Sequence, residues 1–251
     1  MNNWSPPWHS GQKHASQTLD WLPSDTKEVH QKLMHDPEYA EHARQQGWLE
    51  PDAITYKINN HGFRCDDFDN KTDCLVALGC SYSVGIGLPL KDIWPTLVGN
   101  ELGLKICNLS WGGIGADTCY RLAEYWIPQL SPKLVVMLAP PKARIELLTV
   151  DSDLQAEVFL PMSESGFFSD QDVYLKHWFA NEENSRINSR KNRRAVEHLC
   201  NELGIRCLTY DAHTFMARDR ADVGYARDYM HAGPKGHQLA FEQIIKDYHG
   251  R

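Results

Sequence analysis

The chain has 251 residues, of which 42% are hydrophobic and 24% charged, so it is long enough to bury a substantial core. Its formal net charge of −7 would repel a phosphate backbone, and its basic stretch, residues 186–194, has the spacing of a solvated helix face. These features argue against nucleic-acid binding. No apolar run approaches the length of a membrane helix, and the amino-terminal residues lack the apolar centre of a signal peptide.

The seven cysteines are odd in number and irregular in spacing, which does not indicate a disulfide framework. No CxxC pair indicates a zinc site. We therefore expect free thiols, the reducing conditions of the cytoplasm, and no metal or membrane partner.

In chain order, the sequence predicts an amino-terminal extension, residues 1–55, and then an α/β domain, residues 56–251. The first part of the extension is rich in Trp, Pro and Ser and is expected to follow a surface. Ser24 or Asp25 is expected to cap a helix that runs to Gly47.

The α/β domain begins with an alternating stretch, residues 54–64, that is expected to form a strand and then a turn. Four continuous apolar runs follow, and such runs are typical of strands that are covered on both faces. These predicted strands are residues 74–79, 105–110, 133–139 and 205–211. The predicted helices are residues 93–102, 111–126 (its start a turn), 183–203 and 235–248.

This alternation predicts a parallel sheet between two helical layers, that is, a three-layer α/β/α fold whose functional groups gather at the carboxyl ends of the strands. Residues 150–182 interrupt the alternation and are too long for a plain connection. We expect them to form a lid or binding insertion in which Phe167 or Phe168 covers the site.

Two small nucleophilic side chains, Cys80 and Ser81, directly follow the first predicted strand, between Gly79 and the pair Gly85 and Gly87. A serine at this place is often only a helix cap, and it needs a base to become a nucleophile. Three glycines after a strand are also compatible with a phosphate-binding loop. No Gly-Lys-Ser/Thr follows, however, and the GxGxxG spacing is not met.

A base for Ser81 is available near the carboxyl terminus, where Asp228 and His231 stand three residues apart. Within one turn, the carboxylate can contact one imidazole nitrogen and leave the other free to accept a proton. A loop histidine beside a capping acid would explain the same spacing. His237 is expected on the surface or in the core.

Together these segments resemble the SGNH (GDSL-type) serine hydrolases. Residues 79–83 are similar to the family's Gly-Asp-Ser-x-Ser block, residues 108–113 to its second block, and residues 228–231 to its Asp-x-x-His block. Residues 59–64, Asn-Asn-His-Gly-Phe-Arg, resemble a segment found ahead of the nucleophile in some members, although a simple Asn-x-Gly turn explains them equally well.

The resemblance implies a flavodoxin-like SGNH hydrolase fold and a Ser-His-Asp catalytic triad. Ser81 would be the nucleophile, His231 the general base and Asp228 its orienting acid. The N–H groups of Ser81 and Gly113 would hold the oxyanion, and no cofactor would be needed.

The sequence departs from the family at two places. Cys80 replaces the Asp before the nucleophile, and Pro141, which has no N–H to donate, replaces the oxyanion asparagine of the third block. Lys142 and Arg144 are candidate contacts to charge on the substrate, and Trp111 is a candidate wall of the site. Simpler explanations are that Lys142 and Arg144 are a solvated pair at the strand end and that Trp111 packs between helix and sheet.

These observations predict a carboxylic ester hydrolase that acts on small or carbohydrate-linked acyl esters. An acyltransferase with the same triad is an alternative, because the acyl-enzyme is common to both reactions. A degenerate SGNH fold retained as a ligand-binding module is a third possibility, favoured by Pro141, and a nucleotide-binding module is the least supported. The oligomeric state is left open.

Overall fold

The computed structural model describes residues 8–68, 73–150, 156–159, 178, 181–216 and 223–250. Its centre is a four-stranded parallel sheet with the strand order β4-β3-β5-β8. In chain order, the strands are β3 (Cys74–Leu78), β4 (Lys105–Asn108), β5 (Leu134–Ala139) and β8 (Arg206–Asp211). β3, the first of these strands in the chain, lies between β4 and β5 in the sheet. The topological switch point therefore falls between β3 and β5.

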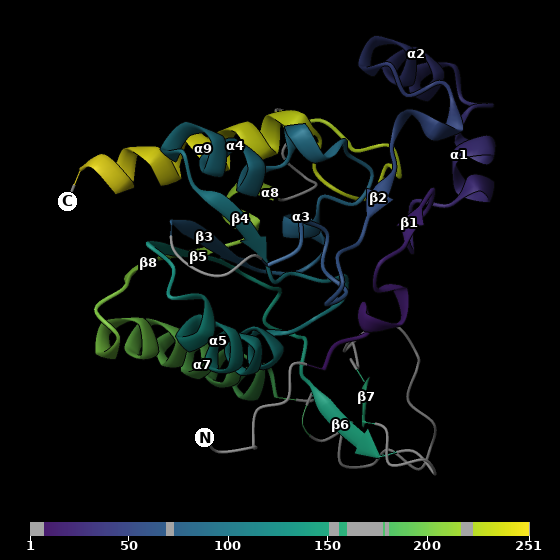
Figure 1. Ribbon diagram of the computed structural model, residues 1–251. Helices are drawn as coiled ribbons and strands as arrows, with labels where there is room; N and C mark the ends of the chain where they lie inside the picture. Colours follow the sequence, from purple (N-terminus) through teal and green to yellow (C-terminus); the bar gives the residue numbers. More distant parts are fainter. Residues whose placement is uncertain are drawn as a thin grey trace.

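Helices cover both faces of the sheet, which confirms the predicted three-layer α/β/α fold (Figure 1). One layer contains α4 (Trp94–Leu102) and α9 (Pro234–His249), with the short α8 (His213–Met216) beside α9. The opposite layer contains α5 (Ala116–Leu130) and α7 (Glu182–Glu202).

The sheet separates two cores, and the alternation of side chains along β3 shows how. Leu75 and Ala77 belong to the core beneath α4 and α9, whereas Val76 and Leu78 belong to the core on the α5 side. Successive residues of a strand point to opposite faces, so a run that is buried throughout has to be apolar throughout. This is the physical reason why the four strands could be predicted as continuous apolar runs.

The single helix predicted to end at Gly47 is two helices, α1 (Lys27–Leu33) and α2 (Pro37–Gln46). The Asp36 side chain caps α2 by accepting hydrogen bonds from two backbone N–H groups, and Pro37 occupies its first turn. Proline has no N–H and fits only at a helix start, so it divides the predicted helix. Thr26, rather than Ser24 or Asp25, caps α1, through a 3.2 Å hydrogen bond from the N–H of Val29.

The predicted strand over residues 54–64 is mostly loop. Only β2 (Tyr56–Lys57) is extended, and it pairs antiparallel with β1 (Thr18–Leu19). The predicted turn is present, since the N–H of Gly62 donates to the carbonyl of Asn59 at 3.0 Å. Short 3-10 turns complete this part of the chain at η1 (Gln12–His14) and η2 (Pro51–Ala53). A third, η3 (Leu90–Asp92), lies within the connection from β3 to β4.

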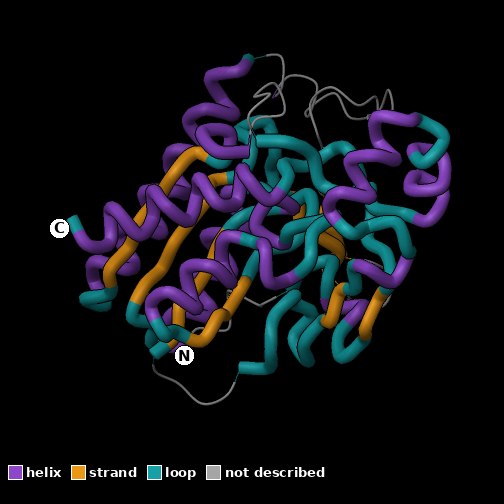
Figure 2. Tube along the Cα trace, turned by 90° about the horizontal axis from the view of Figure 1, so that it is seen from above, coloured by secondary structure: helices purple, strands orange, loops and turns teal. Residues whose placement is uncertain are grey.

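The amino-terminal segment lies on the side of the molecule toward which β4 points, and α1, α2, β1 and β2 are stacked there (Figure 1). The view from above shows these helices and strands to one side of the central sheet (Figure 2). Leu22, Tyr39 and Tyr56 of this segment are buried in the same core as β3. The segment is therefore packed against the carboxyl ends of the strands, where the predicted site lies.

The predicted insertion at 150–182 is described only in part. Its start overlaps β6 (Leu147–Val150), which pairs antiparallel with β7 (Ala156–Phe159). Phe167 and Phe168 lie outside the described residues, so the prediction of a covering insertion and the division at residue 55 remain predictions. Within the described ranges, no helix is both long and apolar enough to cross a bilayer.

Candidate active site

Ser81 is placed by a sharp turn from strand to helix. It is the first residue of α3 (Ser81–Val84), directly after β3 and the extended residue Cys80, and it is 5% exposed. A Cβ atom at Gly79 would lie 2.2 Å from Oγ and 2.9 Å from Cβ of Ser83, so the absence of a side chain at residue 79 lets the first turn of α3 pack against the end of β3. The first N–H groups of a helix have no partner within the helix, which leaves the N–H of Ser81 open above the sheet.

Gly87 is the point where the turn after Ser81 meets the loop that carries Asp228. Its φ of 78° is in the left-handed region, and a Cβ there would lie 2.9 Å from both the Cβ of Ala226 and the backbone nitrogen of Arg227. Its carbonyl accepts a 2.9 Å hydrogen bond from the N–H of Arg227. The glycine therefore allows the loop that carries Asp228 to dock on the turn after Ser81, and close packing explains its presence better than a phosphate does.

Arg64 stabilises the turn that follows Ser81 through hydrogen bonds to its backbone carbonyls. This buried guanidinium donates to the carbonyls of Val84 (3.0 Å), Gly85 (2.7 Å) and Leu88 (2.8 Å). Burial lowers the pKa of Arg64 to about 10. Residues 59–64 thus form the Asn-x-Gly turn that was one of the two explanations of this segment. The segment also supplies Arg64, which binds the backbone after Ser81.

Asp228 and His231 form the contact that their spacing predicts. Nδ1 of His231 lies 2.6 Å from Oδ2 of Asp228, and the backbone N–H groups of Met230 and His231 each donate to Oδ1 at 3.0 Å. Burial by itself raises the pKa of the Asp228 carboxyl, but the hydrogen bond and charge of His231 and the donors around it lower the pKa below its usual value. Asp228 is therefore an anion that orients the imidazole.

The loop that carries this pair is strained. Tyr229, between Asp228 and Met230, has a φ of 56°, which is unusual for a bulky residue. Its ring packs against Tyr225 and Tyr39, at centroid distances of 4.3 and 5.6 Å. Strain of this kind persists where surrounding contacts enforce it, and it is common at active sites.

The pair adjoins the nucleophile turn without a hydrogen bond to it. The Tyr82 ring, next to Ser81, meets the His231 ring edge-on at 5.4 Å between centroids. In the described part of the chain, the hydroxyl of Ser81 contacts Sγ of Cys80 at 4.0 Å and is not bonded to His231, whose Nε2 accepts no protein donor. Such bonds are often long in unliganded enzymes and shorten when substrate binds.

The end of β4 and the turn after it carry Asn108 and Gly113, of which Gly113 is the second predicted oxyanion donor. Gly113 lies in the turn after β4 with a φ of 82°, and over the described ranges its N–H donates to no protein acceptor. The buried amide of Asn108 donates to the carbonyl of Ser83 at 2.9 Å and ties this strand end to α3. The geometry thus brings the first two sequence blocks together.

Of the candidate substrate contacts, Trp111 and Lys142 have other partners. Trp111 is 6% exposed and packs beneath the amino-terminal segment, with ring centroids 6.0 Å from His9 and 6.1 Å from His14. Lys142 is exposed and forms an ion pair with Glu182 at the start of α7. Neither side chain is free to face a substrate in this structure.

Arg144 is different, because Nη1 is buried and has no hydrogen-bond partner within the described residues. It follows β5 in the segment where Pro141 has removed a donor. Burial holds the pKa of the Cys119 thiol well above its usual range; Cys80 adds to this effect, and Arg144 opposes it. The guanidinium is therefore close enough to Cys119 of α5 to affect that thiol electrostatically.

His237 belongs to the core rather than to the site. It is 1% exposed, and its Nδ1 accepts a 3.0 Å hydrogen bond from the N–H of Trp94. Burial, with a smaller effect from His231, lowers the pKa of His237 to about 3. This histidine is neutral at ordinary pH.

The sequence interpretation missed the amino-terminal residues that reach the site. Ser24 donates to Oδ2 of Asp228 at 2.7 Å, and Asp25 binds the buried guanidinium of Arg227 through two hydrogen bonds of 2.9 and 2.7 Å. The hydroxyl of Tyr56 also donates to Asp25. The available signal was Ser24 itself, which follows a proline in a turn where no cap is needed.

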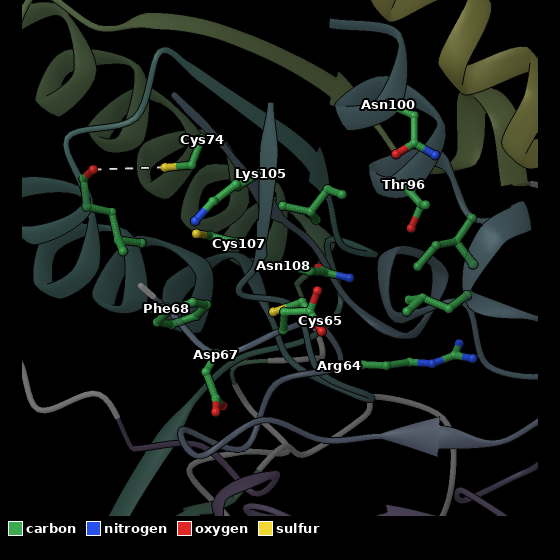
Figure 3. A pocket seen from close by; sticks show the side chains of 15 residues that line it. Arg64, Cys65, Asp67, Phe68, Cys74, Thr96, Asn100, Lys105, Cys107 and Asn108 are labelled. Carbon is green, nitrogen blue, oxygen red and sulfur yellow. Dashed lines mark hydrogen bonds between the residues drawn. The ribbon is translucent and has the colours of Figure 1, made fainter. Parts of the chain in front are cut away.

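A cavity of about 350 Å³ lies away from this constellation, at the outer edge of β4 (Figure 3). Arg64, Asn108 and the thiols of Cys65, Cys74 and Cys107 line it, together with side chains of α4. None of Ser81, Asp228 or His231 is among its lining residues. The cavity is thus separate from the chemistry, and we do not assign the substrate to it.

Comparisons with known proteins find similarity at the level of solved structures alone. No family model and no curated protein matches the chain. It is similar to the esterase EstA of a Pseudoalteromonas species (13% identity over 72% of this chain and all of that one, TM-score 0.38). It is also similar to a GDSL-like lipase from Bacteroides thetaiotaomicron (11%, 83% and 96%, TM-score 0.37). A third likeness is a carbohydrate esterase family 2 enzyme from Corynascus thermopiles (17%, 74% and 69%, TM-score 0.38). These likenesses are distant, so the function has to be argued from the residues of the site.

Proposed function

We propose that the protein is a carboxylic ester hydrolase of the SGNH type that acts on small or carbohydrate-linked acyl esters. The observation that carries the proposal is the 2.6 Å contact between Asp228 and His231, docked through Gly87 on the turn that displays Ser81. A buried, ionised carboxylate on Nδ1 leaves Nε2 as the basic nitrogen, which is what a serine nucleophile requires.

In this mechanism, Oγ of Ser81 attacks the acyl carbon while Nε2 of His231 takes its proton. The backbone N–H groups of Ser81 and Gly113 donate to the oxyanion of the tetrahedral intermediate. His231 then protonates the leaving alkoxide, and Asp228 stabilises the imidazolium throughout. Water releases the acyl group from Ser81; if a sugar hydroxyl does so instead, the same site acts as an acyltransferase.

A fluorophosphonate probe tests the proposal, because it forms a stable adduct only with a base-activated serine. Peptide mapping should place one adduct on Ser81. Ser81→Ala and His231→Ala should abolish the adduct, and Cys80→Ala should retain it. An unlabelled wild-type protein that also lacks esterase turnover would instead identify the degenerate ligand-binding alternative, which the loss of the donor at Pro141 favours.

We propose Arg144 as the donor that replaces the third-block asparagine. Its buried, unpartnered Nη1 is available to an oxyanion or to an anionic substrate group. Arg144→Met should lower kcat/KM for acyl esters by about 10²-fold, the usual effect of losing one oxyanion donor. Lys142→Met, which removes a neighbouring cation that is already paired with Glu182, should change kcat/KM by less than about twofold. Equal effects of the two substitutions would refute the assignment.

We also propose that the protein works in the cytoplasm. All seven cysteines are free thiols, six of them buried, and none is paired as a disulfide. Free thiols persist where glutathione and thioredoxin keep them reduced.

A further inference from the structure

The carboxylate of Asp228 is saturated with hydrogen bonds, and one of them comes from a residue far away in the sequence. Two backbone N–H groups donate to Oδ1, and His231 and the hydroxyl of Ser24 both donate to Oδ2. An ionised carboxylate offers about four lone-pair sites, so all are occupied. Because Asp228 is 1% exposed, a site left empty by Ser24 would lie in a nearly dry environment.

Ser24 is held in this position at a conformational cost. It has a φ of 76°, and it lies in a tight turn closed by a 3.2 Å hydrogen bond from the N–H of Leu22 to the carbonyl of Asp25. Glycine or asparagine usually occupies such a turn position, because other residues are strained in the left-handed region. The backbone conformation of Ser24 is therefore unfavourable for a serine. Such residues are expected where the side chain contributes to a functional site.

Contacts of neighbouring residues hold the Ser24 hydroxyl within hydrogen-bond distance of Asp228. Asp25 binds Arg227 through two hydrogen bonds, so two consecutive residues of the amino-terminal segment hold two consecutive residues of the catalytic loop. The hydroxyl of Tyr39 also donates to the carbonyl of Arg227 at 2.6 Å. The amino-terminal segment therefore contacts both Arg227 and Asp228 and fixes the position of the Asp228 carboxylate.

We infer that Ser24 is a positioning residue of the active site, a fourth member that orients Asp228 and tunes its charge for His231. This role rests on the proposed function, in which Asp228 and His231 activate Ser81. The Ser24 hydroxyl shares Oδ2 with Nδ1 of His231, so it withdraws charge from the oxygen that the imidazole contacts. It also stops the carboxylate from rotating away from the histidine.

Three substitutions separate this role from a structural one. Ser24→Gly removes the hydroxyl but relieves the strained φ, so the protein should be more stable than Ser24→Ala while kcat falls by about tenfold. Ser24→Ala should lose the same activity without gaining stability. Ser24→Thr keeps the donor on a β-branched residue, so it should lose stability and keep most of kcat.

A second readout does not depend on turnover. NMR titration of His231 should show its pKa shifted upward in Ser24→Gly and Ser24→Ala, because a carboxylate that has lost a donor stabilises the imidazolium more strongly. The titratable groups around the pair, namely Asp25, Tyr39, Tyr82, Arg227 and His237, are the same in every variant. The acid limb of kcat/KM should move upward with it.

The outcomes distinguish the two proposals. An upward shift in the titration of His231 without any esterase activity in the wild type would support the coupling and refute the proposed function. Unchanged titration and unchanged kcat in Ser24→Gly would refute the positioning role, whatever the activity of the wild type. A loss of kcat that follows the loss of stability across the three variants would refute it as well.

Discussion

Replacing His231 by alanine should lower kcat/KM for a short acyl ester by about 10⁴- to 10⁶-fold, because the nucleophile then has no base and the leaving alkoxide no acid. In the structure, Nδ1 of His231 is occupied by Asp228, and only Nε2 is available for this task. Steady-state kinetics on purified protein measures the loss. His237→Asn is the matched control and should leave kcat/KM within a few-fold, since His237 lies in the core and binds Trp94.

In the proposed mechanism, the general base His231 also makes activity depend on pH. Imidazolium cannot accept a proton, so kcat/KM should fall on the acid side, within the range of about pH 5 to 8 where histidines titrate. A second effect has to be separated from this one. Burial lowers the pKa of His237 to about 3 and that of His9 to about 4, from 6.5.

The sign of that second effect follows from linkage. Both folded-state pKa values are depressed, so between pH 6.5 and about 4 the unfolded chain binds more protons than the folded one. The stability is present above pH 6.5 and is lost as the pH falls through this window. Denaturant unfolding at each pH therefore has to accompany the rate profile, and an acid limb that coincides with unfolding would count against His231 as its origin.

Removing Asp25 should destabilise the protein by about 3–5 kcal/mol, because it leaves the Arg227 guanidinium buried without its counter-charge. Both side chains are almost completely inaccessible, and Arg227 also donates to the carbonyl of Pro51 at 2.8 Å and stacks over the Trp21 ring. A loss of this size is a large part of the stability of a typical domain. Asp25→Ala should therefore show a much lower urea midpoint, or fail to fold at the growth temperature.

Two variants make this result interpretable. Asp25→Ala combined with Arg227→Met should recover part of the stability, because the unpaired buried charge is then gone. Asp66→Ala, which breaks the exposed pair with Lys57, should change the free energy of unfolding by at most about 1 kcal/mol. If Asp25→Ala were as mild as Asp66→Ala, the ion pair would not be what holds the amino-terminal segment against the catalytic loop.

The sequence alone was sufficient for the layered architecture and for the contact between Asp228 and His231, whereas the catalytic triad stays a prediction. Strands such as Cys74–Leu78 are buried on both faces, so they are continuous apolar runs, and glycines and prolines mark where they and their helices end. The contact between Asp228 and His231 could also be predicted from local sequence, but for a different reason. The two residues are three apart, and a single turn of backbone brings them together.

Only the tertiary structure decided which other residues meet at that loop. Ser24 was interpreted as a helix cap, because a serine before a helical pattern usually is one, yet its hydroxyl reaches Asp228, 204 residues away. Arg64 belongs to the segment 59–64 that resembles a family block, but neither its partners nor those of Arg227 could be predicted, since a buried arginine is recognised by the carbonyls and carboxylates around it. Local periodicity records which face of an element is buried. Contacts between distant segments depend on how the whole chain packs, and no short-range pattern encodes them.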